Sequence, residues 1–376
     1  MKRYAAFAAC LGMAAFTTTA MGAVTLGNTV RTGGELHFTV TGESNAIYIV
    51  EGSTNLQQWQ PVNTNREFAV ARTVSVNVSN SRSYYRARVA RPFTAALVAR
   101  STISLDGNGI RIDSYDSANP YYSTPDGRYD PSKFNDRGDV TVYSALTNSL
   151  ILGNAKIFGT VAIGPGGSTI LGPSGCVGSI IYVLDPNNAG TIQPGRLREE
   201  TGSFFPDAIP PSLGLIVPPP GNVGGINYDY VLGDGDYGLA SLSLSGGRKM
   251  IVIGRAMLHV SGNFSVSGSG QITVARTASL RLYVGGPSAA IGGVVNQNFS
   301  PLGFQYYGLP GNTNVTLAGN GAFVGVIYAP RAEVSMGTGG NDAIDFLGAI
   351  VANTVRVIGH YNVHYDENLA RSGPLF

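Results

Sequence analysis

The fold is decided by an eight-residue stretch that occurs twice: Phe323-Val324-Gly325-Val326-Ile327-Tyr328-Ala329-Pro330 and, 23 residues later, Phe346-Leu347-Gly348-Ala349-Ile350-Val351-Ala352-Asn353. The shared Phe, Gly, Ile and Ala fall on alternate positions, and therefore on one face of a strand. Short alternating runs interleave at 315–317, 334–336 and 355–357. A repeat of this length with about three short strands is typical of one turn of a parallel β-helix. We expect Phe323 and Phe346 to stack in adjacent turns, with Gly325 and Gly348 leaving room for the rings.

Residues 256–285 show the same organisation. Apolar residues are paired at the strand spacing of two, at 258/260, 264/266, 272/274 and 280/282. Successive pairs are six to eight residues apart, which leaves no room for a crossover helix. Residues 157–162 look like a further such strand, with Ile157 at the Phe position. The 51 Gly and 20 Pro among 376 residues also disfavour helices. We expect an all-β chain in which residues 93–376 form a parallel β-helix, right-handed by the general rule for parallel connections.

Two stretches interrupt the solenoid pattern. Residues 112–139 hold six acids and three bases without apolar alternation, and residues 206–224 hold six prolines, which favour an extended conformation. We interpret both as loop insertions that leave the solenoid, or, for the second, as a linker between two solenoid segments. The other face of the repeated strands is also apolar (324, 326 and 328; 347, 349 and 351), so a loop, a helix or another subunit should cover it.

Residues 24–92 predict a separate small β-sandwich. Alternating runs at 36–40, 46–50, 74–78 and 84–89 are separated by Gly, Asn and Ser clusters. In a sandwich of this size the only tryptophan, Trp59, is expected to fill the core; an exposed sugar-stacking tryptophan is the alternative.

The first 23 residues predict a secretory signal peptide. Lys2 and Arg3 precede an apolar run of about twelve residues, and small residues typical of a signal-peptide cleavage site follow that run. The run is too short to span a bilayer, and it continues past Cys10, which disfavours a lipoprotein. Without Lys2 and Arg3 the chain has 23 basic and 23 acidic residues. Its net charge is then zero and does not indicate nucleic-acid binding. The mature chain would keep one cysteine, Cys176, have no transmembrane segment, and reside in the periplasm, at the cell surface or outside the cell.

Two resemblances add to these inferences. The segments 51–59 and 84–89 resemble a fibronectin-III-like module of secreted bacterial proteins. The segments 306–310, 325–330 and 359–367 resemble an uncharacterised β-solenoid domain family of exported bacterial proteins, some of them pilus-associated. The first resemblance implies a spacer or adhesion module, and the second implies a fold and a compartment without an assigned reaction.

Acids in 112–139 are the weak candidates for a metal site. Asp113, Asp116, Asp126, Asp130 and Asp139 could supply oxygen ligands to Ca²⁺. Their spacing does not match an EF-hand, and Arg128, Lys133 and Arg137 offset their charge. Polar loop turns explain the same residues. We therefore expect no tight calcium requirement and no cofactor.

The C-terminal motif offers a second metal candidate. His360 and His364 lie four apart, followed by Asp366 and Glu367. Their neighbours alternate as a strand, which would place the histidines about 13 Å apart, too far for one zinc ion. We interpret this motif as a polar cap at the exposed end of the solenoid.

No set of residues predicts a catalytic site. Between 250 and 340 the only acid is Glu333, whereas glycosidases need paired carboxylates. The sequence favours an exported structural or adhesive protein, binding polysaccharide or surface proteins through flat faces rich in Tyr, Asn, Ser and Thr. The alternative is a carbohydrate-active enzyme, a polysaccharide lyase or glycoside hydrolase, with its site in the 112–139 loop.

Overall fold

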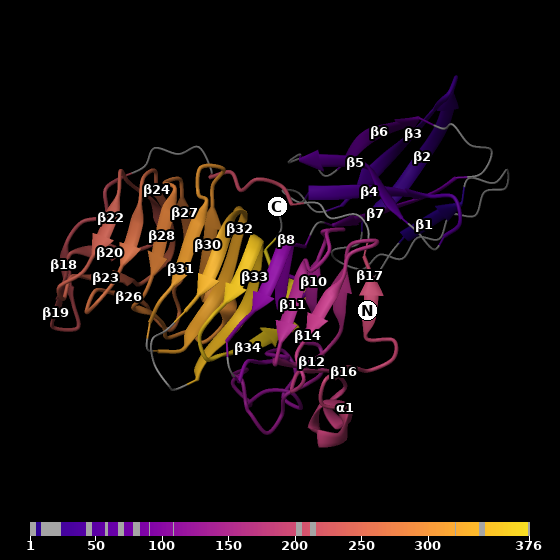
Figure 1. The fold of residues 1–376 in the computed structure, drawn as a ribbon. Helices are drawn as coiled ribbons and strands as arrows, with labels where there is room; N and C mark the ends of the chain where they lie inside the picture. The colour runs from indigo at the N-terminus through magenta and orange to yellow at the C-terminus, as the bar shows by residue number, and fades with distance from the viewer. Residues whose placement is uncertain are drawn as a thin grey trace. The chain divides into compact units, whose positions relative to one another are not determined.

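The computed structural model describes residues 5–8, 24–42, 47–56, 59–66, 71–77, 83–89, 91–107, 109–200, 205–210, 216–319, 321–337 and 343–374. Strands dominate throughout, as the sequence predicts (Figure 1). The chain divides into two compact units. An N-terminal unit is built around the residues up to Pro92, and a solenoid unit comprises Phe93–Glu200 and Phe205–Gly373.

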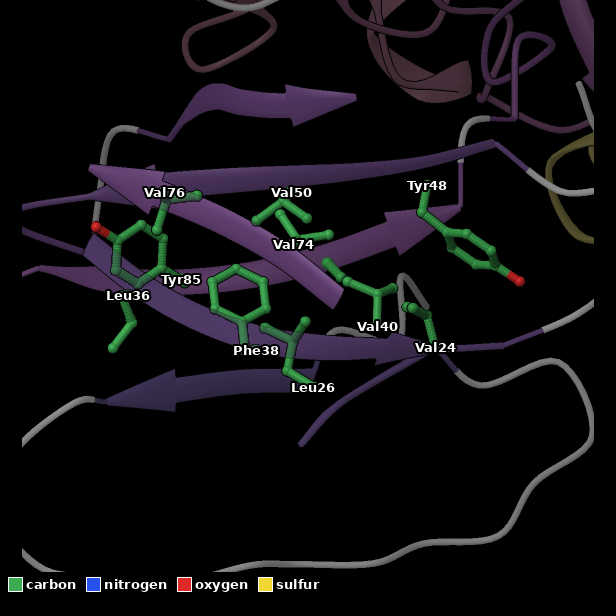
Figure 2. Close-up of a cluster of buried hydrophobic side chains, with 11 residues drawn as sticks. Val24, Leu26, Leu36, Phe38, Val40, Tyr48, Val50, Val74, Val76 and Tyr85 are labelled. Atoms are coloured by element: carbon green, nitrogen blue, oxygen red, sulfur yellow. The ribbon is translucent and has the colours of Figure 1, made fainter. Parts of the chain in front are cut away.

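The N-terminal unit is a β-sandwich of two antiparallel sheets. One sheet has the order β1-β7-β4-β5 and the other β2-β3-β6. The strands are β1 (Ala5–Ala8), β2 (Thr25–Thr32), β3 (Glu35–Thr41), β4 (Ile47–Ser53), β5 (Gln60–Arg66), β6 (Ala71–Asn77) and β7 (Tyr84–Val89). Side chains from both sheets meet in one apolar cluster: Val24, Leu26, Leu36, Phe38, Val40, Tyr48, Val50, Val74, Val76, Tyr85 and Ala87 (Figure 2). Of the predicted signal peptide, residues 1–4 and 9–23 lie outside the described residues.

Trp59 is not part of this core, so the expectation that it fills the sandwich is wrong. Its ring is half-buried under the Arg86 guanidinium, whose Cζ lies 4.2 Å from the ring centroid. The indole Nε1 donates a hydrogen bond of 3.2 Å to the carbonyl of Leu56. Phe38 and Tyr85, with ring centroids 5.9 Å apart, occupy the core instead.

The solenoid unit consists of parallel strands stacked turn upon turn. Its C-terminal segment comprises the hairpin β18 (Gly221–Val223) and β19 (Ile226–Tyr228), then β20 (Tyr230–Leu232), β21 (Gly235–Leu239), β22 (Leu242–Leu244), β23 (Lys249–Val252), β24 (Arg255–Val260), β25 (Phe264–Val266), β26 (Gln271–Val274), β27 (Ser279–Val284), β28 (Ser288–Ile291), β29 (Val294–Asn296), β30 (Phe304–Gly308), β31 (Asn314–Leu317), β32 (Phe323–Met336), β33 (Ile344–Val357) and β34 (Tyr361–Asp366). Each turn pairs in parallel with the next, for example β24 with β27 and β27 with β30. The four apolar pairs of 256–285 all lie in strands and are fully buried.

The N-terminal segment adds further turns to the same solenoid. Its strands are β8 (Leu97–Leu105), β9 (Arg111–Tyr115), β10 (Val140–Val142), β11 (Leu150–Gly153), β12 (Lys156–Phe158), β13 (Val161–Ile163), β14 (Thr169–Leu171), β15 (Cys176–Gly178), β16 (Thr191–Ile192) and β17 (Leu197–Glu199). A short helix, α1 (Ile180–Leu184), precedes β16. Strand β8 pairs with β10 and β11, β10 pairs with β13, and β13 pairs with β17.

The two segments meet in one shared turn. On the edge of β33 that faces away from β32, Ile344–Leu347 pair with β34 and Ile350–Val357 pair with β8. The last strand of the unit, β34, and the first, β8, therefore form one turn. We call it the shared turn. Figure 1 shows the yellow β33 and β34 beside the violet β8. The chain thus enters the solenoid in its middle at Phe93, runs to one end, crosses to the other end and returns.

The predicted aromatic column is present. Phe323 and Phe346 pair in register, and their rings stack with centroids 5.2 Å apart and planes inclined by 12°. The column continues through Val363 and Ile112 to Ile157, as the sequence predicts for Ile157. A Cβ at Gly325 would lie 3.0 Å from ring atoms of Phe304 and Phe323, so this glycine does leave room for rings.

Gly348 is required for a different reason. Its φ is +144°, and a Cβ there would overlap the carbonyl oxygen of Gly325 on the neighbouring strand. The constraint is the close approach of two backbones, not the volume of Phe346.

A strap, residues 205–210 and 216–220, belongs to the proline-rich stretch that joins the two segments. Pro206 accepts a hydrogen bond of 2.6 Å from the buried hydroxyl of Tyr328, and Arg331 binds Asp207 through two contacts of 2.6 and 2.7 Å. At its far end Ile216 bridges to Tyr237 of β21. The second face of the repeated strands is covered in part: Val326, Tyr328, Ala349 and Val351 have no exposed surface, as predicted, whereas Val324 and Leu347 are only half-buried.

Candidate functional site

The buried carboxylates and the buried histidine that the structure describes in the solenoid unit gather beside the shared turn. Asp113 and Asp116 come from β9 and the loop that follows it, and His364, Asp366 and Glu367 come from β34 and the residue after it. All five are less than 9% exposed. They meet because β9 and β34 pair in parallel, with His364 opposite Asp113. The cluster therefore depends on the pairing of strands about 250 residues apart.

His364 lies at the centre of one half of the cluster. Its Nδ1 is 2.6 Å from Oδ1 of Asp113, and its Nε2 is 3.3 Å from Oδ1 of Asp345. The ring of Tyr129 stacks on the imidazole at a centroid distance of 3.8 Å, and its hydroxyl donates to Oδ2 of Asp113 at 3.0 Å. The Arg111 Nε also donates to that oxygen, at 2.6 Å. Both oxygens of Asp113 and both nitrogens of His364 are thus engaged.

The environment shifts the proton affinities in this half. Burial alone lowers the pKa of His364, but the hydrogen bonds with Asp113 and Asp345 outweigh it, and the net pKa is raised. The hydrogen bond from His364 holds the pKa of Asp345 below its ordinary value. Burial raises the pKa of the Tyr129 hydroxyl above its usual range, and the charge of Asp113 adds to this. The protonated histidine is therefore the form that this geometry favours.

The other half contains two further carboxylates. Glu367 accepts hydrogen bonds from Ser114 (3.0 Å) and Asn135 (2.8 Å), and Arg137 lies 3.2 Å from it. Asp366 accepts from the backbone N–H and the hydroxyl of Ser117, at 3.0 and 2.7 Å. Burial raises the pKa of both carboxyls and outweighs the hydrogen bonds that they accept, which lower it. These bonds connect the end of the C-terminal segment to the loop after β9.

The structure does not bring the five predicted metal candidates together. Asp113 is bound to His364, and Asp116 forms an ion pair with Arg371. Asp126 pairs with Arg128 at 2.7 Å, and Asp130 accepts hydrogen bonds from both the backbone N–H and the hydroxyl of Ser132. Asp139 accepts from the N–H of Thr160, while burial raises its pKa. Within the ranges that the structure describes, no three His, Cys, Asp or Glu side chains are grouped as metal ligands.

The C-terminal motif is not a cap at the end of the solenoid, so that expectation is wrong. Strand β34 lies inside the stack, between β33 and β9, because the N-terminal segment continues the solenoid beyond it. His364 is buried there, whereas His360 is half-buried just before the strand. The two histidines are not joined in one site.

Sequence reasoning missed two members of the cluster, Asp345 and Tyr129. Asp345 belongs to β33, one turn away from β34, and reaches His364 because it pairs opposite Asn362. Tyr129 comes from the middle of the 112–139 loop, whose path over β34 has no local signal. Next to this cluster, the hydroxyl of the fully buried Tyr115 has no hydrogen-bond partner among the described residues, and its ring packs edge-on against Tyr129.

The contacts of this cluster link the two solenoid segments. Both nitrogens of His364 lie within hydrogen-bond distance of carboxylates, and the Tyr129 ring stacks on the imidazole. Four contacts of the cluster that join one solenoid segment to the other are Asp113 to His364, Ser114 to Glu367, Ser117 to Asp366 and Asp116 to Arg371. The cluster therefore holds the shared turn closed.

Comparison with known proteins places one part of the chain. Residues 225–372 match the sequence model of a domain of unknown function (DUF7305). No curated protein and no solved structure matches the chain. The matched range begins in the hairpin β18–β19 and ends in the short helix α2 (Leu369–Ser372), so it corresponds to the C-terminal segment of the solenoid. In the described parts of the chain, none of the helices has the length and apolar character needed to cross a membrane.

Proposed function

We propose that this protein is an exported structural or adhesive protein whose solenoid is a rigid scaffold for contact with polysaccharide or with other surface proteins. Export is inferred from the leader-like residues 1–23 and from the resemblance to exported bacterial β-solenoid and fibronectin-III-like proteins. The scaffold role is inferred from the way in which the buried ionisable groups are used.

The observation that carries the proposal is the closure of the shared turn. Buried charges are costly unless they are paired and hydrogen-bonded. Here His364 bonds to Asp113 across the junction, and Glu367 accepts a hydrogen bond from Ser114 of the other segment. These charged groups are buried instead of facing solvent. Removing one partner of such a group costs about 3–5 kcal/mol, so the arrangement fixes how the two segments join. This use of charge serves rigidity.

The test compares binding, cleavage and stability in one set of variants. The purified mature chain is applied to a glycan array and to insoluble polysaccharides, and the same polysaccharides are assayed for new reducing ends. Asp113→Asn and His364→Asn perturb the cluster, and Asp126→Asn, in an exposed ion pair, is the matched control. We expect binding without cleavage, a lower melting temperature for the two cluster variants, and no change for the control.

The alternative, a carbohydrate-active enzyme, is tested by the same assays. Cleavage by the wild-type chain that is lost in Asp113→Asn, while that variant keeps its fold, would replace our proposal by this one. Asp345 is the carboxylate to examine next in that case, because its side chain is 44% exposed and contacts His364. Export is tested separately, by cell fractionation and N-terminal sequencing of the mature protein.

A further inference from the structure

Strand β7 of the N-terminal unit holds a neighbour on each side. On one side it pairs with β4, and on the other it pairs antiparallel with β1, with Ala5 opposite Ala87 and Ala8 opposite Tyr84. Strand β7 is also the last strand of the sandwich, because the chain leaves the unit at Pro92. Within the described part of the unit, the strand beside β7 is thus supplied by the first residues of the chain.

Those first residues belong to the predicted signal peptide. The inference that follows therefore rests on the proposed export, in which residues 1–23 are removed. Cleavage would leave the outer edge of β7 without a partner strand.

We propose that the outer edge of β7 is a strand-acceptor site, which in the mature protein takes an extended, uncharged, alanine-rich segment of a partner polypeptide. An unpaired edge presents a row of N–H and C=O groups, and adding a strand to such an edge is a general mode of peptide recognition. The segment that pairs there, Ala5-Ala6-Phe7-Ala8, is four residues long and uncharged.

The side chains of β7 define what the partner strand must carry. Tyr85 and Ala87 are buried in the apolar core, and Arg86 between them points outward to Glu51 of β4. Residues opposite Tyr85 and Ala87 lie on the core side of the sheet in any strand with this register. Apolar residues are therefore required at alternate positions, with small ones at the position opposite Ala87.

The partner is a different polypeptide rather than a second copy of this chain. In the described part of the sandwich, the edge strands that a second mature copy could add without unfolding are β2, β5, β6 and β7 itself. Each of them contains an arginine, so none matches the uncharged, alanine-rich segment that pairs with β7 here.

The test uses a labelled peptide with the sequence of residues 4–9 and the mature chain, residues 24–376. Binding is measured by fluorescence anisotropy, and hydrogen exchange is followed at the amides of β7. The control peptide carries Ala6→Pro and Ala8→Pro, which remove backbone donors from the added strand. The control protein is the full chain, residues 1–376, produced without export so that the leader is retained.

We expect the mature chain to bind the peptide and to gain protection at β7. The proline peptide should bind at least about tenfold more weakly, because it lacks two backbone N–H donors. The full chain should not bind, because its own leader fills the edge. Equal protection of β7 in both proteins without peptide binding, or self-association of the mature chain through β7, would overturn the inference. Retention of the leader in N-terminal sequencing would instead refute the proposed processing, whatever the peptide does.

Discussion

The stacked pair Phe323 and Phe346 gives the sharpest test of the solenoid assignment. Phe346 has no exposed surface, and Phe323 is 7% exposed. A buried aromatic side chain removes about 150–250 Å² from water, which at about 25 cal/mol per Å² corresponds to about 4–6 kcal/mol. We therefore expect Phe346→Ala to cost about 3–5 kcal/mol, the usual range for such a truncation. Phe323→Ala should fall in the same range, since its ring also meets Phe304 edge-on at 5.6 Å.

The coupling between the two rings is measured by a double-mutant cycle. Ring pairs in contact contribute about 0.5–1.5 kcal/mol beyond the area that they bury, so the double variant should depart from additivity by at least about 0.5 kcal/mol. The free energies come from urea unfolding together with native-state hydrogen exchange at the amides of β32 and β33. Exchange reports the local opening of these two turns even where a repeat protein does not unfold in one step.

The same two strands supply the control. Ser335 and Arg356 pair in register on the outward face, where Arg356 is exposed. Alanine substitutions there should cost less than about 0.5 kcal/mol each and should be additive. Strict additivity at the Phe pair, with single costs as small as these, would show that the two rings are not stacked in adjacent turns.

Four further predictions follow from individual contacts. Gly348→Ala should destabilise the solenoid by at least about 1–3 kcal/mol in urea unfolding, because a Cβ would meet the Gly325 carbonyl, whereas Gly321→Ala, with open space around it, should change little. Tyr328→Phe should cost about 1 kcal/mol and speed proteolysis of the strap, because Pro206 loses its donor, while equal cleavage rates would contradict that contact. The raised pKa of His364 means that its imidazole binds a proton more tightly in the folded chain than in the unfolded chain. The contribution of this proton to the free energy of unfolding is therefore complete below about pH 6.5 and is lost at higher pH. The urea midpoint should rise when the pH is lowered from 8 to 6, and His364→Asn should make the midpoint less dependent on pH. Calcium and a chelator should give the same melting temperature, because Asp113, Asp116 and Asp126 are bound by cationic side chains, and a shift above about 10 °C would contradict this.

The fold was predictable from the sequence because its signals are local. Alternation at spacing two, the recurrence of Phe-x-Gly-x-Ile-x-Ala and the short intervals between strands are all visible within a few tens of residues. The position of Ile157 in the column of Phe346 follows from the same alternation. Trp59 shows the limit of such reasoning, because local sequence does not reveal that Arg86 covers its ring at the surface.

The order of the turns was not predictable in the same way. Along the solenoid, β33 is followed by β34 and β8, so sequence order and spatial order diverge at the shared turn. Nothing near His364 indicates that Asp113, 251 residues earlier, is its partner. The motif therefore looked like a terminal cap, and the buried cluster could not be assembled from spacing alone.

The boundary of the matched domain explains what the shared turn does for the fold. Residues 225–372 end where β33 and β34 would otherwise present a long unpaired edge with an apolar interior behind it. Such an edge invites pairing with other chains, and solenoids need caps at their ends. Here β8 and β9 cover that edge along most of its length, and the Asp113–His364 pair and Glu367 fasten the added strands. The N-terminal segment thus serves as a covalently attached continuation of the matched domain. This explains why the buried carboxylates and the buried histidine described in the solenoid unit lie at an internal junction.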